Sequence, residues 1–214
     1  PKECITRCKP AGIKVICDVI DLKYAQKVEA LGADAVIAVN SEAGGHAGNI
    51  DPEELISNLS QNLGIPVISA GGISSSEDIK RHLSFGAAAV SVGTVFIATP
   101  EAGVSNDYKE ALVSYGKKDI VRTTKMSGSA LTVINTPYVQ SIGTKASFLE
   151  RLMHKNKWLK KYIKMIIAFR GLKAIEKAAN QATYKTVWVA GPVIENIHSI
   201  EPVRMVSKRL TEGL

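Results

Sequence analysis

The chain is poor in cysteine: Cys4, Cys8 and Cys17 are the only three in 214 residues. So small and odd a number cannot build a disulfide framework, and it indicates a reducing, cytoplasmic compartment. Long apolar runs are also lacking, since the longest one near the basic region, 165–169, is far too short to span a bilayer. The composition therefore excludes a disulfide-rich secreted domain and predicts a protein without a membrane partner.

Acidic side chains are scarce in one region, residues 151–177, where nine Lys and Arg face the single acid Glu176. This segment accounts for the net charge of +7 on the whole chain. No nucleic-acid-binding motif accompanies it, so we expect no nucleic-acid partner. The charge is then either a solvated helix face or a means of attracting a small anionic substrate.

Metal-ligand clusters are missing as well. Cys4 and Cys8 would share one face of a helix, but nothing near them in the sequence completes a site. We therefore predict no metal.

The first 100 residues alternate short apolar runs with helical patterns. Strands are expected at 14–17, 35–39, 67–70 and 89–92, and helices at 22–31, 52–63 and after Ser75 or Ser76. The apolar runs do not alternate with polar residues, which is typical of a parallel sheet buried on both faces. Repeats of this length suit a doubly wound sheet or a TIM barrel. Four strands cannot close an eight-stranded barrel, so either the sheet is open or further strands precede residue 1.

The pattern changes after residue 100. A helix is expected at 107–115, β-branched residues surround 127–129, a short strand covers 185–189, and a helix covers 202–210. Residues 146–181 are mostly helical in pattern, with an apolar stripe opposite lysines. We expect three parts: βα units over 1–100, a helical cap over 101–185, and a segment over 186–214 that returns to the first part. The stripe comprises Leu159, Tyr162, Ile163 and Ile166.

Glycines follow three of the predicted strands, at Gly44-Gly45, Gly71-Gly72 and Gly93. Parallel strands end at one edge of a sheet, so loops that follow them can touch one ligand. Backbone N–H groups in such loops bind anions, and glycine lets a ligand approach closely. The alternative is that the glycines only permit tight turns.

One histidine, His46, lies within the first of these glycine loops. A neutral imidazole there could accept a proton from an acidic carbon, and an imidazolium could stabilise an anion. Glu42 could orient the loop, act as a catalytic group, or be only a helix-side carboxylate. His82, His154 and His198 are expected at the surface, and Ile79 and Leu83 are expected to form the apolar face of their helix.

Four segments, 32–49, 65–73, 85–99 and 123–137, resemble the nitronate monooxygenase family, formerly the 2-nitropropane dioxygenases. They read GADAVIAVNSEAGGHAGN, IPVISAGGI, FGAAAVSVGTVFIAT and TTKMSGSALTVINTP. The resemblance extends over 1–137 and 187–210. It implies an α/β fold, a TIM (β/α)8 barrel of which this chain carries the C-terminal half, with a mostly helical cap, and it is compatible with a homodimer.

The resemblance also implies FMN as cofactor and His46 as the catalytic base or anion partner beside the flavin. The residues that it assigns to cofactor binding are Asn40, Gly44, Gly45, Gly71, Gly72, Ser91, Val92, Gly93 and Thr94.

The implied reaction is oxidation of an alkyl nitronate by O2 to a carbonyl compound and nitrite. Two departures bear on it. Many members have Gln-Gly where this chain has Val39-Asn40, so a polar flavin contact is either lost or supplied by Asn40. Relatives often have Ala-Gly-Gln where this chain has Ala190-Gly191-Pro192, which leaves the substrate open. Two alternatives remain: an FMN- and NAD(P)H-dependent enoyl-thioester reductase with an acyl-carrier partner, and a flavin- or phosphate-binding protein without turnover.

Overall fold

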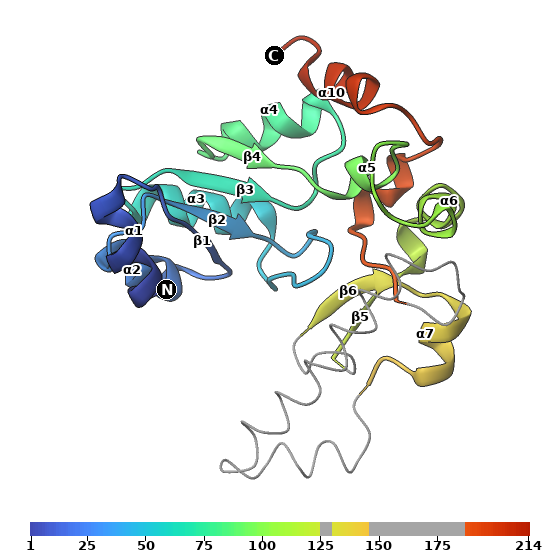
Figure 1. The fold of residues 1–214 in the computed structure, drawn as a ribbon, viewed down its shortest axis with the longest axis horizontal. Helices are drawn as coiled ribbons and strands as arrows, with labels where there is room; N and C mark the ends of the chain where they lie inside the picture. Colours follow the sequence, from blue (N-terminus) through green and yellow to red (C-terminus); the bar gives the residue numbers. More distant parts are fainter. Residues whose placement is uncertain (125–129, 146–186) are drawn as a thin grey trace. The chain divides into compact units, whose positions relative to one another are not determined.

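The computed structural model describes residues 1–124, 130–145 and 187–214 (Figure 1). Of the predicted cap region 101–185, residues 125–129 and 146–185 lie outside the described residues, and with them the apolar stripe, the basic segment and the turn at 127–129. The chain divides into two compact units. Unit 1 comprises Pro1–Ala43, Ala47–Gly93 and Arg204–Leu214, and unit 2 comprises Gly44–His46 and Thr94–Val203. The three-part division expected from the sequence stays a prediction.

Unit 1 contains a four-stranded parallel sheet in the order β1-β2-β3-β4, as the apolar runs predicted. Its register pairs Cys17 with Val36, Ile37 with Ile68, and Ser69 with Val90. The strands are β1 Ile16–Val19, β2 Ala35–Val39, β3 Val67–Ala70 and β4 Ala89–Ser91. The helices are α1 Lys2–Cys8, η1 Lys9–Ala11, α2 Leu22–Ala30, α3 Pro52–Asn62, α4 Ser76–Ser84 and α10 Val203–Thr211, the last beginning one residue before its segment of unit 1.

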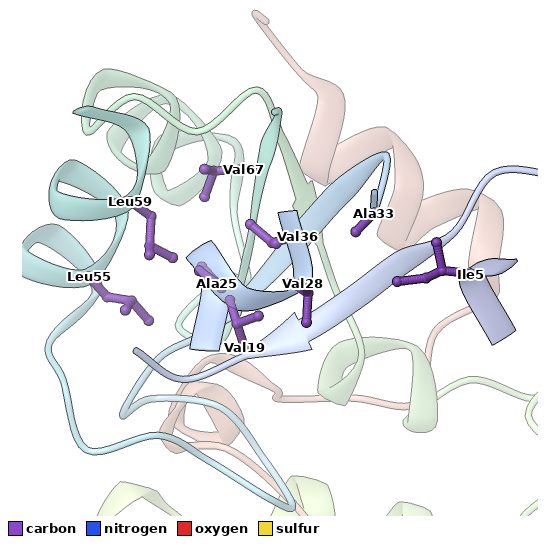
Figure 2. Close-up of a cluster of buried hydrophobic side chains, with 10 residues drawn as sticks. Ile5, Val19, Ala25, Val28, Ala33, Val36, Leu55, Leu59 and Val67 are labelled. Carbon is purple, nitrogen blue, oxygen red and sulfur yellow. The ribbon is translucent and has the colours of Figure 1, made fainter. Parts of the chain in front are cut away.

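Each connecting helix of unit 1 starts at an Asp or Ser whose side chain caps its N-terminus, and both residue types are favoured at N-caps. Asp21 accepts a hydrogen bond from the Tyr24 N–H, Asp51 from the Glu53 N–H, and Ser75 from the Asp78 N–H. The apolar faces of α2 and α3 meet the sheet in one buried cluster (Figure 2). The buried members of that cluster include Val28, Val36, Leu55, Leu59 and Val67.

The expectation that all four strands are buried on both faces is wrong for β1 and β4. Every residue of β2 and β3 is buried or half-buried, whereas Ile16 in β1 is 48% exposed and Ala89 and Ser91 in β4 are exposed. The reason is position, because β1 and β4 are the two edges of the sheet among the described residues. In a closed barrel such edges are paired with further strands.

Unit 2 is built around an antiparallel pair, β5 Ile120–Thr123 and β6 Leu131–Ile134. The predicted strand near 185–189 is present in part, since Val189 bridges Val133 and the Ile134 N–H donates to the Trp188 carbonyl. Leu131 and Val133 of β6 form a hydrophobic core of unit 2 together with Val139 and Val187. The helices are α5 Thr94–Ile97, α6 Asn106–Ser114, η2 Lys117–Asp119, α7 Pro137–Ile142 and η3 Pro192–Asn196. In the described parts of the chain, no helix combines the length and apolarity needed to cross a membrane.

Candidate functional site

The carboxyl edge of the unit 1 sheet brings together residues from the ends of three strands. Asn40 follows β2 directly, Gly71 and Gly72 follow β3, and Gly93 lies two residues after β4. Gly71 and Gly72 have φ angles of 107° and 80°, which side-chain-bearing residues rarely adopt. The predicted convergence of strand ends at one edge is therefore present in unit 1.

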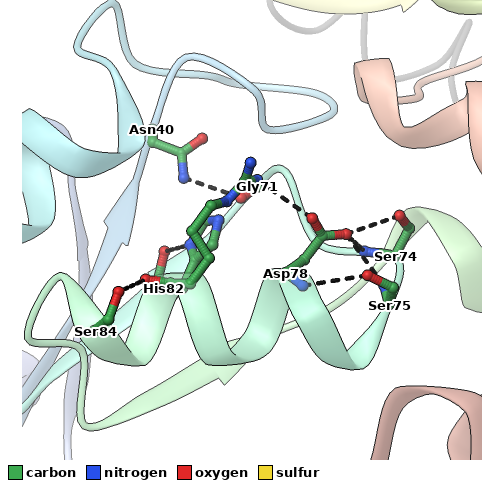
Figure 3. A network of polar contacts seen from close by, with 9 residues as sticks. Asn40, Gly71, Ser74, Ser75, Asp78, His82 and Ser84 are labelled. Atoms are coloured by element: carbon green, nitrogen blue, oxygen red, sulfur yellow. Dashed lines mark hydrogen bonds and ion pairs between the residues drawn. The ribbon is translucent and has the colours of Figure 1, made fainter.

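Asn40 holds two of these loops together (Figure 3). Its Nδ2 donates to the Gly71 carbonyl at 3.0 Å, and its Oδ1 accepts from the Glu42 N–H at 2.9 Å. The Asn40 backbone N–H donates to the Ala70 carbonyl at 3.1 Å. The residue is fully buried, with 0% of its surface exposed. Its polar side-chain atoms are thus engaged within the protein.

The two glycines after β3 are needed for this approach. A Cβ on Gly71 would lie 2.5 Å from the Ala43 backbone nitrogen and would collide with Asn40 Oδ1. A Cβ on Gly72 would collide with the Glu42 carboxylate. The Glu42 side chain therefore packs against the loop that follows β3.

The N-terminus of α4 follows the same loop and is closed by its own side chains. Ser75 and Asp78 form a reciprocal capping box. Asp78 Oδ2 accepts from the Ser74 N–H and hydroxyl, both at 2.9 Å, and from the Ser75 N–H at 3.1 Å. Burial acts to raise the pKa of Asp78, but these hydrogen bonds outweigh it and lower the pKa below its usual value. The amides of Ser74 and Ser75, just before α4, and of Asp78 within it are therefore already occupied.

The expectation that His82 lies at the surface is wrong. It is fully buried, its Nδ1 lies 2.7 Å from the Ser69 hydroxyl, and its ring packs 5.8 Å from that of Phe85. Burial lowers its pKa, so the imidazole is held neutral. Leu83, expected to face the core, is 41% exposed. The spacing of three from Ile79 to His82 was the available signal, because it places both on one helix face.

The loop after β4 is open. Gly93 is exposed, and a Cβ there would meet nothing within 4 Å. Among the described residues, the backbone N–H groups of Gly72 and Gly93 meet no protein acceptor. Unpaired amides at the carboxyl edge of a parallel sheet suit an anionic group such as a phosphate. Ser91 and Val92, which precede Gly93, are exposed and half-buried respectively.

The first glycine loop belongs to unit 2, where Gly45 forms a two-way bridge with Thr132. The Thr132 N–H donates to the Gly45 carbonyl at 2.7 Å, and the Gly45 N–H donates back at 3.1 Å. A Cβ on Gly44 would lie 2.7 Å from the Gly191 nitrogen. These glycines thus serve close packing against the chain's own backbone. His46, which follows them, is exposed.

Unit 2 also fixes the segment 188–191. The Tyr108 hydroxyl donates a short hydrogen bond to the Val189 carbonyl, and its ring stacks on Trp188 at 5.7 Å. Burial raises the pKa of Tyr108 well above its usual value, so the phenol stays protonated. Thr94 Oγ1 accepts from the Gly191 N–H at 3.3 Å. The sequence reasoning did not identify Tyr108, whose partner lies 81 residues away.

Metal ligation has no support in residues 1–124, 130–145 and 187–214, which contain no group of three or more His, Cys, Asp or Glu able to hold an ion. Cys4 and Cys8 do share one face of α1, with their Sγ atoms 3.9 Å apart.

Comparison with known proteins gives a family match over nearly the whole chain. The nitronate monooxygenase family model matches residues 1–213. A nitronate monooxygenase of Pseudomonas aeruginosa is 36% identical over 137 residues, which is 60% of this chain and 39% of that protein. The (3aS,4S,5R,7aS)-5-hydroxy-7a-methyl-1-oxo-octahydro-1H-indene-4-carboxyl-CoA dehydrogenase of Rhodococcus jostii is 36% identical over 141 residues, 66% of this chain and 40% of that protein.

The structure of FabK from Thermotoga maritima superposes with a TM-score of 0.81 at 30% identity, covering 98% of this chain and 63% of that one. The chain thus spans about two fifths of the length of the curated relatives it matches. Its parallel βα units correspond to one part of the TIM barrel that its structural neighbours form. Taken with the glycine loops at the carboxyl edge of the sheet, the match over residues 1–213 shows that the chain belongs to the nitronate monooxygenase family.

Proposed function

We propose that the protein uses FMN to oxidise alkyl nitronates with O2. The observation that carries this proposal is the family match over residues 1–213, supported by a relative that is itself called a nitronate monooxygenase. In the net reaction, two nitronates and one O2 give two carbonyl compounds and two nitrites, which balances atoms and charge. FMN supplies the electron transfer to O2 when bound, and the protein supplies binding and orientation.

The phosphate of FMN is proposed to accept hydrogen bonds from the N–H groups of Gly72 and Gly93. Both amides lack a protein acceptor among the described residues, whereas the Ser74 and Ser75 amides, just before α4, are occupied by Asp78. The remaining cofactor residues are proposed on the resemblance alone. They are Gly44, Gly45, Gly71, Ser91, Val92 and Thr94.

Gly93→Asp tests the phosphate assignment. A carboxylate at this open position would repel the phosphate, so we expect FMN affinity to fall at least about tenfold, which corresponds to about 1.4 kcal/mol. Gly103→Asp is the matched control, because Gly103 is also exposed with nothing within 4 Å of its Cβ position. Fluorescence titration of FMN measures both. Equal affinity in the two variants would remove Gly93 from the proposed site.

The reaction itself is tested by oxygen uptake of the intact, FMN-loaded protein with an alkyl nitronate and no nicotinamide. We expect uptake with release of one nitrite per nitronate consumed. Bound flavin without uptake under these conditions would contradict the proposal.

His46 is proposed as the base or anion partner beside the flavin, on the family resemblance and on its exposed position. His46→Ala should lose most of the turnover, in the range of about 10²–10⁴-fold for a general base, while FMN affinity is retained. His198→Ala, at another exposed histidine of unit 2, is the control and should leave turnover unchanged. Full turnover in His46→Ala would overturn the role proposed for His46.

A thioester substrate is the second candidate. The observation that favours it is the carboxyl-CoA dehydrogenase of Rhodococcus jostii, which is as similar to this chain as the nitronate monooxygenase. An enoyl-thioester reductase would predict anaerobic bleaching of the flavin by NADH or NADPH and reoxidation by an enoyl thioester. Bleaching without oxygen uptake on nitronate would move the assignment to this class. Flavin binding without either reaction would indicate a binding protein.

A further inference from the structure

We propose that Asn40 is a positioning residue that braces the loop after β3 against the loop after β2, and that it does not itself touch the flavin. This inference deepens the proposed function, because the braced loop contains Gly72, the proposed phosphate donor. The resemblance alone left two possibilities for this position: a lost flavin contact, or a contact that Asn40 supplies.

The hydrogen bonds of Asn40 point to the bracing role. Its amide nitrogen donates to the Gly71 carbonyl at 3.0 Å, while its amide oxygen accepts from the Glu42 N–H at 2.9 Å. One side chain therefore satisfies a backbone acceptor in one loop and a backbone donor in the other. The three residues that make these bonds, Asn40, Glu42 and Gly71, all lie within unit 1.

Burial excludes a direct contact. Asn40 has 0% of its surface exposed, so no ligand atom can reach its side chain without displacing part of the fold. A ligand contact to its Oδ1 would also compete with the bond from Glu42. Loss of either bond would leave a backbone group of a half-buried residue, Gly71 or Glu42, without this partner, which is costly.

The backbone of the braced loop needs such support. Gly71 and Gly72 have φ angles of 107° and 80°. A pair of glycines can adopt several other backbone conformations, so this one needs contacts that favour it. Asn40 Oδ1 and the Ala43 backbone fill the space where a Gly71 side chain would lie. The Asn40 amide thereby selects one arrangement, in which the Gly71 carbonyl is turned to the protein and the next amide, that of Gly72, is left without a protein acceptor.

The sequence context explains why the residue is an asparagine. Many family members have Gln-Gly where this chain has Val39-Asn40, so relatives of that kind have no side chain at position 40. In this chain a short amide replaces the glycine and reaches across to the neighbouring strand end.

Hydrogen–deuterium exchange of the flavin-free protein tests the bracing directly. In Asn40→Ala, the amides of Ser74 and Ser75, which end the braced loop and donate to Asp78, should exchange about tenfold faster than in the parent, and FMN affinity should fall by a similar factor. Asn58→Ala, at an exposed asparagine of α3, is the control and should change neither quantity. Should Asn40→Ala fail to fold, Asn40→Asp keeps the size and the acceptor for Glu42, and replaces the donor to Gly71 by a carboxylate oxygen that the Gly71 carbonyl repels.

The outcomes separate this inference from the proposed function. Faster exchange at Ser74 and Ser75 supports the brace even in a protein that proves unable to oxidise nitronates. Unchanged exchange together with weaker FMN binding would overturn it in favour of a direct contact. Unchanged exchange and unchanged FMN affinity would overturn it outright.

Discussion

At the scale of single residues, two glycines with a positive φ make very different demands on the structure. Gly12, after η1, has a φ of 70°, and a Cβ there would meet nothing within 4 Å. Gly71 has a φ of 107°, and a Cβ there would strike backbone atoms of Ala43. The sequence pattern places Gly71 in a turn after a strand and makes no prediction for Gly12. Only the structure tells which of the two is also closely packed, because the atoms that surround Gly71 come from about 30 residues earlier in the chain.

Alanine at each of these positions measures the difference. We expect Gly12→Ala to lower the free energy of unfolding by about 1 kcal/mol, the cost of a left-handed conformation. Gly71→Ala adds overpacking against backbone and should lower it by about 3 kcal/mol. Urea denaturation of both variants gives the comparison. Equal losses would show that the loops near Gly71 adjust freely.

At the scale of helices and strands, local chemistry predicted most of the fold. Strands 35–39 and 67–70 agree with the structure, and the Ser75 cap is where the sequence placed it. The errors have long-range causes. His82 turns inward because the Ser69 hydroxyl on β3 offers it a partner, and β1 is exposed because of its edge position. At the candidate site, glycine positions were predictable from pattern, whereas the bonds of Asn40 and Asp78 depend on side-chain geometry that a pattern does not encode.

The cap of α4 yields a prediction at this scale. Ser75→Ala removes the acceptor for the Asp78 N–H and should destabilise the protein by about 1 kcal/mol. Ser84→Ala, at the opposite end of α4, removes only an exposed hydroxyl that bonds the Arg81 carbonyl. Its effect should stay within about 0.5 kcal/mol. Thermal or urea unfolding of the pair tests this, and equal effects would mean that the capping box contributes little.

At the scale of the whole molecule, the buried imidazole of His82 links stability to pH. Burial lowers the pKa of His82 in the folded protein, while in the unfolded chain it lies near about 6.5. The unfolded state therefore binds the proton more readily, and folding stability falls as the solution becomes more acidic. The contribution is complete above about pH 6.5 and is lost as the pH falls toward the folded-state pKa.

His82→Gln removes this titration and should flatten the dependence of the urea midpoint on pH below about 6.5. His198→Gln, at an exposed histidine, should leave the slope of the parent protein unchanged. A slope that is the same in all three proteins would assign the acid sensitivity to other groups.

The stacked pair of Tyr108 and Trp188 has an optical consequence. The chain has two tryptophans, at 158 and 188, and Trp188 lies in unit 2 with 2% of its surface exposed. In a Trp158→Phe variant, tryptophan emission during denaturation follows Trp188 and hence unit 2, while far-ultraviolet circular dichroism records the helices of both units. If the two curves coincide, the two units unfold in one cooperative transition. If they separate, the change in emission gives the denaturant midpoint of unit 2, and the ellipticity that remains beyond it comes from unit 1.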